Sequence, residues 1–265
     1  MIDIELQNKL RAEYNPDGSL LRRQQMRMLE ILLHIDKICK ENNIPYWLSS
    51  GTLLGAVRHE GFIPWDDDVD IEMMREDYLR FEKIFKETDD YVLQTHKNDP
   101  FYMMPYAKVR DKHTSMVELG GSGSEYKYRG VFVDIFVIEH THEIMNFATY
   151  APIWLLSKWT CGKVLNGFAR WVFMFCKKII FATISLLRVI LKLVPGKKLR
   201  HTYGTWCYNE GERYNEELFP LNIMEFEGYE LPIPHNANAY LERLYGDYMR
   251  LPEVKEIHTA KVEFF

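Results

Sequence analysis

Acidic side chains are concentrated in one short stretch between Ile63 and Glu72. Asp68 and Asp70 stand two residues apart, and Asp66 precedes them at the same spacing. On an extended strand, residues two apart share a face and lie about 6–7 Å apart, so we expect these carboxylates to point together while Val69 and Ile71 face the core. Carboxylates this close repel each other unless a cation lies between them, and oxygen ligands favour magnesium, with manganese also possible.

Asp134 is the one acid in an apolar run from Val131 to Val137. A lone charge in a buried strand is costly unless it is paired or bound to a metal, so Asp134 is the natural third ligand beside Asp68 and Asp70. The alternative is that residues 66–70 form an acidic surface turn and that Asp134 pairs with an arginine.

A small-residue turn, Ser50-Gly51-Thr52, comes one short strand before the acidic cluster and opens a helix. Backbone amides at a helix N-terminus bind phosphate oxygens, and glycine lets such a ligand approach closely. Serine and threonine are also common helix caps. Its position before the acidic pair favours the interpretation that the turn is the other half of a nucleotide-phosphate site.

Three basic residues are candidates for binding a donor diphosphate. Lys108 and Arg110 stand two apart and therefore project from one strand face. The alternative is a surface pair bridged to Asp111 or Glu118. Arg58, at the end of the helix that follows the turn, is a further candidate.

The elements that must position these side chains alternate between helical and extended patterns. We predict helices at 20–43, 53–58 and 77–86, and extended segments at 46–48, 62–73, 91–95, 106–110 and 131–138, with Ser19 capping the first of these helices. This alternation predicts a mixed α/β sheet. The glycine-rich stretch 120–124 is expected to be a loop that folds over substrate.

The block from Gly51 to Ile71 closely resembles the LicD family, as do the segments from Phe226 to Pro234 and from Tyr240 to Met249. Members of that family resemble phosphocholine transferases of bacterial surface glycans and, more remotely, the fukutin and fukutin-related ribitol-phosphate transferases. The resemblance implies an α/β, nucleotidyltransferase-like mixed sheet flanked by helices.

The resemblance also implies roles for residues. Gly51 and Thr52 match the phosphate-cradling turn, Asp68 and Asp70 the DxD pair, and Asp134 the third carboxylate. It implies transfer of a phospho-alcohol from a CDP-activated donor to a sugar hydroxyl, with release of CMP. Metal at the three acids would lower the acceptor hydroxyl's pKa, and Asp134 or Asp66 would take its proton.

One departure is that fifteen residues separate Thr52 from Asp68, more than in small nucleotidyltransferases. The exact phosphate contacts therefore stay open. The alternatives to phospho-alcohol transfer are a nucleotidyltransferase that releases pyrophosphate from an NTP, and a non-catalytic member that binds glycan or membrane.

The formal charge of −5 over 265 residues hides two parts of opposite sign. Residues 144–209 contain ten basic and no acidic residues, so this segment carries +10 and the rest −15. The net charge argues against a protein whose whole surface serves nucleic acid, and the aromatic and aliphatic content of the basic segment favours lipid over nucleic acid.

The basic segment is expected to be a helical insertion at 141–208, between a catalytic core at 1–140 and a C-terminal part at 209–265 that completes the catalytic domain. Its longest uncharged stretch, Ile144 to Ser157, has fourteen residues, fewer than the roughly 20 that span a bilayer. Helices rich in Trp, Phe and Leu with interspersed Lys and Arg are typical of in-plane membrane helices, so a membrane surface is the expected partner of residues 147–200. A helical subdomain and an oligomer interface are the alternatives.

The four cysteines show neither a CxxC spacing nor a zinc pattern, which favours reduced thiols in a cytosolic setting. The N-terminus lacks the basic and apolar pattern of a signal peptide. We therefore expect a cytoplasmic protein that is peripheral on the inner face of the plasma membrane and acts on a glycan or its lipid-linked precursor.

Overall fold

The computed structural model describes residues 2–117, 125–160, 163, 165–191, 198–201, 212–252 and 261–264. The predicted loop at 120–124 lies outside these residues, as do Cys161 and Cys207. Cys39 and Cys176 are free thiols, as the expected reduced state requires.

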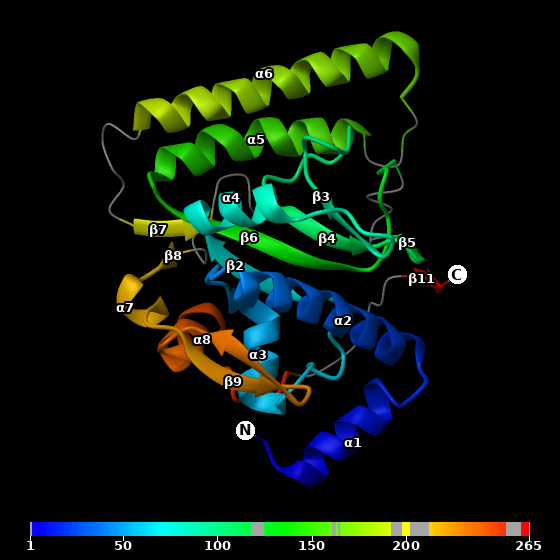
Figure 1. Cartoon of the computed structure of the whole chain (residues 1–265), viewed down its shortest axis with the longest axis vertical. Helices are drawn as coiled ribbons and strands as arrows, with labels where there is room; N and C mark the ends of the chain where they lie inside the picture. The colour runs from blue at the N-terminus through cyan, green and yellow to red at the C-terminus, as the bar shows by residue number, and fades with distance from the viewer. Residues whose placement is uncertain are drawn as a thin grey trace.

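The centre of the molecule is a seven-stranded mixed sheet (Figure 1). Its strands are β1 (Trp47–Leu48), β2 (Asp70–Met74), β3 (Tyr91–Gln94), β4 (Ala107–Asp111), β6 (Phe132–Thr141), β7 (Lys198–His201) and β8 (Glu212–Arg213). The main path runs β1-β2-β6-β4-β3, and β7 extends it from the second half of β6 to β8. Only the β2–β6 pair of this sheet is parallel, so two strand starts meet at its centre.

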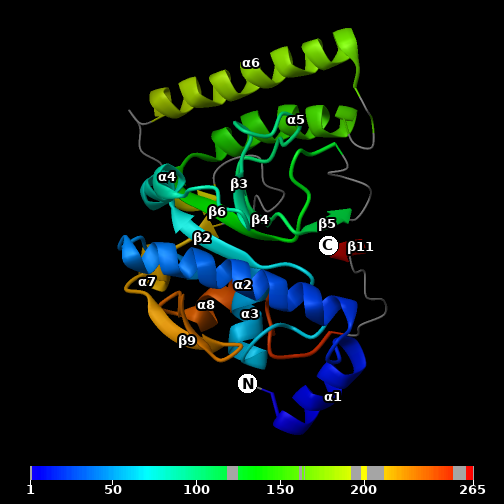
Figure 2. The ribbon, with the colours of Figure 1, turned by 45° about the vertical axis from the view of Figure 1, so that its right-hand side comes forward.

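Two small antiparallel sheets and several helices surround this sheet. β5 (Thr114–Val117) pairs with β11 (Lys261–Phe264), and β9 (Asn222–Phe226) pairs with β10 (Tyr229–Ile233). The flanking helices include α1 (Ile4–Tyr14), α7 (Asn215–Leu218) and α8 (Ala237–Tyr245). The C-terminal segment with β9, β10 and α8 lies beside α3 (Ser50–His59) (Figure 2). The C-terminal part of the chain thus packs against its N-terminal part.

The long helix α2 (Leu20–Glu41) packs against β4 and β6, below the central strands in the view of Figure 1, and α4 (Arg75–Ile84) packs against β2 and β6 from above. Ser19 caps α2 as predicted, because its hydroxyl accepts a hydrogen bond from the Arg22 N–H. Apolar residues on α2 recur at helical spacing and are buried, among them Met28, Leu32 and Ile35. The predicted mixed α/β architecture is thus confirmed.

The predicted extended segment 62–73 is wrong in its first half. β2 begins only at Asp70, and residues 63–66 form a turn in which the Asp66 N–H donates to the Ile63 carbonyl over 3.0 Å. Pro64 lacks an N–H and favours a turn over a ladder. Asp66 and Asp68 therefore lie in a loop, whereas Val69 and Ile71 are fully buried as predicted.

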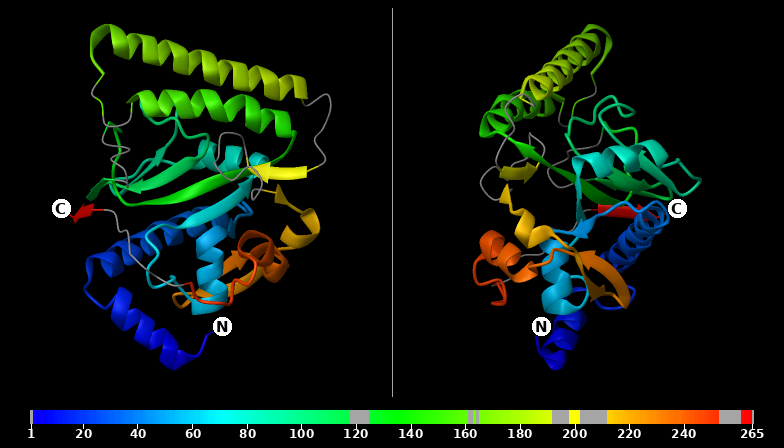
Figure 3. Two further views of the ribbon diagram at one scale, coloured as in Figure 1. Left: turned by 180° about the vertical axis from the view of Figure 1, so that it is seen from behind. Right: turned by 60° about the vertical axis from the view of Figure 1, so that its left-hand side comes forward.

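A pair of long helices covers one side of the sheet. α5 (Glu143–Thr160) follows directly from β6, and α6 (Gly167–Leu191) stacks on α5, so that α5 lies between α6 and the sheet (Figures 1 and 3). Within the described ranges, no helix combines the length and apolar character needed to cross a membrane. In the predicted 141–208 unit, β7 belongs to the main sheet, and the three-part domain division stays a prediction.

Candidate active site

The central parallel strands bring two of the predicted acids together. Asp70 on β2 stands in register with Asp134 on β6, and the Asp134 N–H donates to the Val69 carbonyl over 2.8 Å. Two acids that are 64 positions apart in the sequence therefore lie side by side at the starts of neighbouring strands. The sheet thus brings Asp134 beside Asp70, with which the sequence had grouped it in one predicted ligand set.

The acidic loop that leads into β2 is held in place by two buried amides of α2. Gln24 Nε2 donates to the Asp67 carbonyl over 2.7 Å, and Gln25 Nε2 donates to the Asp66 carbonyl over 2.9 Å. Both glutamines are almost fully buried. Sequence reasoning missed both glutamines. Two adjacent glutamines on the apolar side of a helix are nevertheless a visible signal, because buried amides need fixed hydrogen-bond partners.

The electrostatics of the loop and strand are dominated by like charges. Burial raises the pKa of Asp70 well above its ordinary value, and the charges of Asp68, Asp134 and Asp66 raise it further. Burial likewise raises the pKa of Asp66, whose carboxyl group is hydrogen bonded to Asp68. These pKa shifts place all four carboxylates within electrostatic reach of one another, and carboxyls in such a cluster favour a shared proton or a cation.

Lys108 is the counter-charge of Asp134. The two stand in register on β4 and β6, and Lys108 Nζ lies 2.9 Å from Asp134 Oδ1. Lys108 is 4% exposed and also lies over the ring of Phe132, 3.3 Å from its centroid. Asp134 thus pairs with a lysine that the sequence had suggested only as a candidate for binding a diphosphate.

The small-residue turn is attached directly to the acidic strand. Thr52 Oγ1 accepts a hydrogen bond from the Asp70 N–H over 2.8 Å, and the Ser49 N–H donates to the Asp70 carbonyl over 3.0 Å. A Cβ on residue 51 would lie 2.9 Å from Asp66 Oδ2, so a larger residue there would force that carboxylate to shift. Ser50 opens the helix with a φ of 47°, which places the first turn of α3 against the acids.

The other two predicted cations lie in structural contacts. Arg110 is 1% exposed and donates through Nη1 to the Gly130 carbonyl over 2.8 Å. It lies over the same Phe132 ring as Lys108, so the two share a face as predicted, but the surface-pair alternative is wrong because both are buried. Arg58 donates to the Tyr248 carbonyl over 2.6 Å and is close enough to Asp66 for that charge to raise its pKa against the stronger lowering by burial.

Tyr245, at the end of α8, is a site residue that sequence reasoning did not single out. Burial raises its pKa, and the charges of Asp70, Asp66 and Asp68 raise it further. It is nevertheless 45% exposed. The Tyr-Gly-Asp-Tyr segment from Tyr245 to Tyr248 is the sequence signal for this position. The acids whose charges act on Tyr245 are more than 170 residues away in the sequence.

Glu72, two residues after Asp70 on β2, is a second acid that sequence reasoning passed over. It is fully buried and its carboxylate contacts Arg213 at 2.6 Å, His201 at 2.7 Å, Trp47 at 2.7 Å and Tyr240 at 3.0 Å. Burial by itself would raise the pKa of Glu72, but the charge of Arg213 and the hydrogen bond from His201 outweigh burial and lower it. These contacts hold the segments that follow the helical pair onto β2.

In the described part of the chain, no three His, Cys, Asp or Glu side chains form a ready-made metal cage. At the acids, Lys108 contacts Asp134 and the carboxyls of Asp66 and Asp68 contact each other. These carboxylates are nonetheless oxygen donors, the kind of ligand that magnesium prefers, and two of them, Asp70 and Asp134, stand in register on neighbouring strands.

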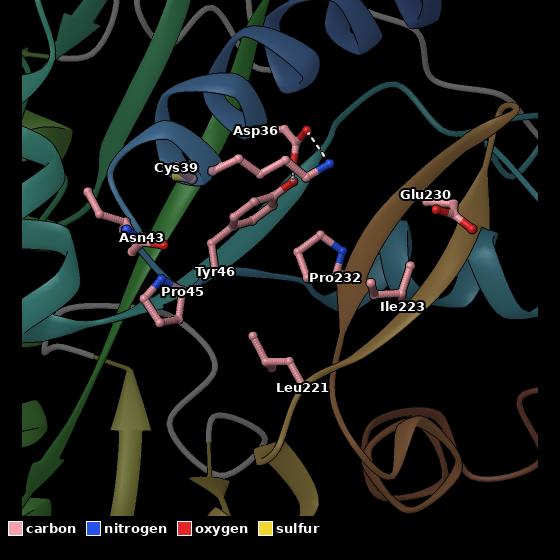
Figure 4. A pocket seen from close by; sticks show the side chains of 11 residues that line it. Asp36, Cys39, Asn43, Pro45, Tyr46, Leu221, Ile223, Glu230 and Pro232 are labelled. Carbon is pink, nitrogen blue, oxygen red and sulfur yellow. Dashed lines mark hydrogen bonds and ion pairs between the residues drawn. The ribbon is translucent and has the colours of Figure 1, made fainter.

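A separate cavity of about 430 Å³ lies between the end of α2 and the β9–β10 hairpin (Figure 4). Tyr46 donates to Asp36 over 2.9 Å at this cavity, and Lys40 pairs with the same carboxylate. None of the predicted site residues line it. It is therefore distinct from the acidic cluster.

Comparison with known proteins agrees with the position of these residues. A family model described as "LicD/FKTN/FKRP, nucleotidyltransferase domain" matches residues 43–159, which include the turn, the acidic loop, Lys108 and Asp134. The lipopolysaccharide cholinephosphotransferase LicD of Haemophilus influenzae is 30% identical over 260 residues, which cover 88% of this chain and 92% of that protein.

Shorter matches connect the chain to animal enzymes. The ribitol-5-phosphate transferase FKTN of Mus musculus is 37% identical over 62 residues, 23% of this chain and 13% of that protein. The ribitol 5-phosphate transferase FKRP of Homo sapiens is 38% identical over 55 residues, 21% of this chain and 11% of that protein. With the similarity to the bacterial enzyme extending over most of both chains, this protein belongs to the LicD family of phospho-alcohol transferases.

Proposed function

We propose that this protein transfers a phospho-alcohol of the phosphocholine type from a CDP-activated donor to a sugar hydroxyl of a cell-surface glycan or its lipid-linked precursor. In this reaction the sugar oxygen forms a bond to the phosphorus distal to cytidine. The bond from that phosphorus to the bridging oxygen breaks, CMP leaves with the electron pair, and the hydroxyl proton passes to a base. The named activity of the Haemophilus relative supports a choline donor and a lipopolysaccharide-type acceptor.

The observation that carries this proposal is the register of Asp70 with Asp134, with Asp66 and Asp68 in the loop directly before β2. Phosphoryl transfer needs neutralised phosphate charge and an aligned acceptor oxygen more than it needs a protein nucleophile. A cluster of mutually repelling carboxylates on rigid strands is suited to that requirement.

Asp68, Asp70 and Asp134 would hold magnesium or manganese, and the fit rests on the raised pKa values of Asp68 and Asp70 and on the all-oxygen donor set. When bound, the metal would neutralise phosphoryl oxygens and lower the acceptor hydroxyl's pKa. In this proposal either Asp66, once it is ionised, or Asp134 takes the acceptor proton.

The other predicted residues receive more specific roles. Gly51 lets a ligand approach beside Asp66, and Thr52 fixes the backbone of Asp70. The cation of Lys108 beside Asp134 is available to a diphosphate once metal occupies the carboxylates. Arg58 and Arg110 hold backbone carbonyls, and we propose that they act on the donor only by supporting the elements that contact it.

The test is incubation of the purified chain with magnesium and CDP-choline, CDP-ribitol, CDP-glycerol or NTPs, in the presence of a glycan acceptor. CMP release together with labelled acceptor supports the proposal and identifies the alcohol. Pyrophosphate release from an NTP would instead establish the nucleotidyltransferase alternative. Neither product from any donor, with a protein shown to be folded by circular dichroism, would contradict both.

A further inference from the structure

The long helix α6 has two apolar faces but packs only one of them. Phe173 and Ile184 on its inner face are buried in a small core with Ile153 and Leu156 of α5 and Met103. This core is separate from the main core around the sheet. The inner face is therefore already occupied by the protein itself.

Two polar anchors fix the orientation of α6 about its own axis. Lys177, 5% exposed, donates through Nζ to the carbonyls of Asp99 and Pro100 over 2.9 and 2.7 Å. Further along the helix, Arg188 contacts Glu139 of β6 at 3.0 Å. Because both anchors lie on the inner side, the opposite face is directed away from the rest of the chain.

That opposite face carries a continuous stripe of large apolar side chains, which we call the α6 outer stripe. Its members recur at intervals of three, four or seven residues: Phe168 (77% exposed), Trp171 (61%), Phe175 (51%), Ile179 (49%), Leu186 (61%) and Ile190 (50%). The first three rings are stacked on one another, with centroid separations of 6.0 and 5.5 Å. α6 forms the outermost layer of the molecule (Figures 1 and 3), so no described element covers the stripe.

The charges around the stripe are of one sign. Lys163 and Lys178 are exposed, and no acidic residue occurs between positions 144 and 209 of the sequence. A second copy of this face would bring cations against cations. A bilayer that contains anionic lipid instead offers apolar chains to the stripe and negative head groups to its basic flanks.

We propose that the α6 outer stripe docks in the plane of an anionic lipid bilayer, with Phe168, Trp171 and Phe175 entering the head-group region. The helix lies in the surface and does not cross it. α5 separates α6 from the sheet, so docking leaves the acidic cluster on the protein side of the pair. The assignment rests on the helix face and not on the transfer chemistry, so vesicle binding and CMP release are independent readouts.

The experiment is sedimentation of the full-length protein with vesicles of phosphatidylglycerol and phosphatidylcholine, compared with phosphatidylcholine alone. We expect binding to the anionic vesicles that weakens at high salt, with a blue shift of tryptophan emission. The triple variant Phe168→Ser/Trp171→Ser/Phe175→Ser should bind at least about tenfold more weakly. Lys178→Gln should weaken binding roughly fivefold, and only on anionic vesicles.

Matched controls come from exposed apolar residues elsewhere. Ile223→Ser on β9 and Leu79→Ser on α4 remove side chains that are 67% and 43% exposed and should leave binding unchanged. Quenching of wild-type tryptophan emission by brominated lipid provides a readout that needs no variant. The proposal is overturned if wild-type protein does not bind anionic vesicles at low salt, or if the triple variant binds equally well. A wild-type dimer that becomes monomeric in the triple variant, without vesicle binding, would assign the stripe to a second copy instead.

Discussion

Two acidic centres lie two residues apart on the same strand and behave in opposite ways. At Asp70, burial and the neighbouring carboxylates raise the pKa, and the nearest cation, Lys108, is bonded to Asp134. At Glu72, the charge of Arg213 and the hydrogen bond from His201 lower the pKa in spite of complete burial, and Trp47 and Tyr240 also donate to the carboxylate.

The difference separates function from architecture. A buried carboxylate with its own cation and donors holds segments together, as Glu72 does between β2 and β8. Buried carboxylates that face one another destabilise the metal-free fold and are suited to a ligand that supplies positive charge. The same strand thus carries a structural acid and, directly before it, the acids that we assign to chemistry.

The largest expected effect is on activity at Asp70. Asp70→Asn should lower turnover by about a thousandfold or more, because loss of a metal ligand removes several kcal/mol of transition-state stabilisation. The measurement is CMP release with magnesium and the preferred CDP-alcohol. The metal-free variant should melt no lower than wild type, since it loses a repelling charge. Asp67→Asn, in the loop directly before β2, is the control and should lose less activity. Equal losses of activity in both variants would show that Asp70 has no special role.

Glu72→Gln should have the largest effect on stability. It removes the carboxylate that pairs with the buried guanidinium of Arg213, which costs about 3–5 kcal/mol. Urea unfolding followed by circular dichroism measures the change in the free energy of unfolding. Glu225→Gln, on an exposed strand position, should change it by less than about 0.5 kcal/mol. If Glu72→Gln is as stable as wild type, the contrast between the two centres is wrong.

Thr52→Val should produce a smaller and mixed effect. The variant keeps the shape of the side chain but loses the oxygen that accepts from the Asp70 N–H, at a cost of about 1–2 kcal/mol in stability. We expect activity to fall more than this loss of stability explains, because the acidic strand start is no longer fixed against α3. Thr52→Ser retains the hydroxyl and should recover most of both. Full activity in Thr52→Val would show that this bond does not position the site.

The smallest expected effect is the pH dependence of magnesium stabilisation. The raised pKa values of Asp66 and Asp70 mean that the metal-free fold favours the protonated forms of both carboxyls. This contribution to stability is present at low pH and is lost as the pH rises through the raised pKa values. Because magnesium needs the ionised carboxylates, it should raise Tm more at pH about 8 than at pH about 5. The lowered pKa of Glu72 works in the other direction, with its stability lost in acid.

Thermal melts with magnesium and with EDTA across this range provide the measurement. The magnesium response should be much smaller in Asp70→Asn. An equal response in wild type and variant would mean that the cation binds elsewhere.

Local patterns predicted α2 with its Ser19 cap, the short strand before the turn, and the strands that carry Lys108 and Asp134. The same patterns wrongly predicted an extended segment at residues 62–69. The alternation of acids was interpreted as strand spacing, without the tertiary contacts that determine the loop. The loop conformation depends on Gln24 and Gln25 of α2, some forty residues earlier in the chain.

The sequence by itself determined which residue types are available for chemistry: the acids, the small-residue turn and the basic aromatic segment, because composition and short-range spacing are local properties of the chain. Only the tertiary structure decided that Lys108 neutralises Asp134, that Tyr245 lies near the acids, and that Glu72 is held by Arg213. These residues lie up to 179 positions apart in the sequence. Charge interactions depend on distance and burial in space, and neither quantity is encoded in spacing along the chain.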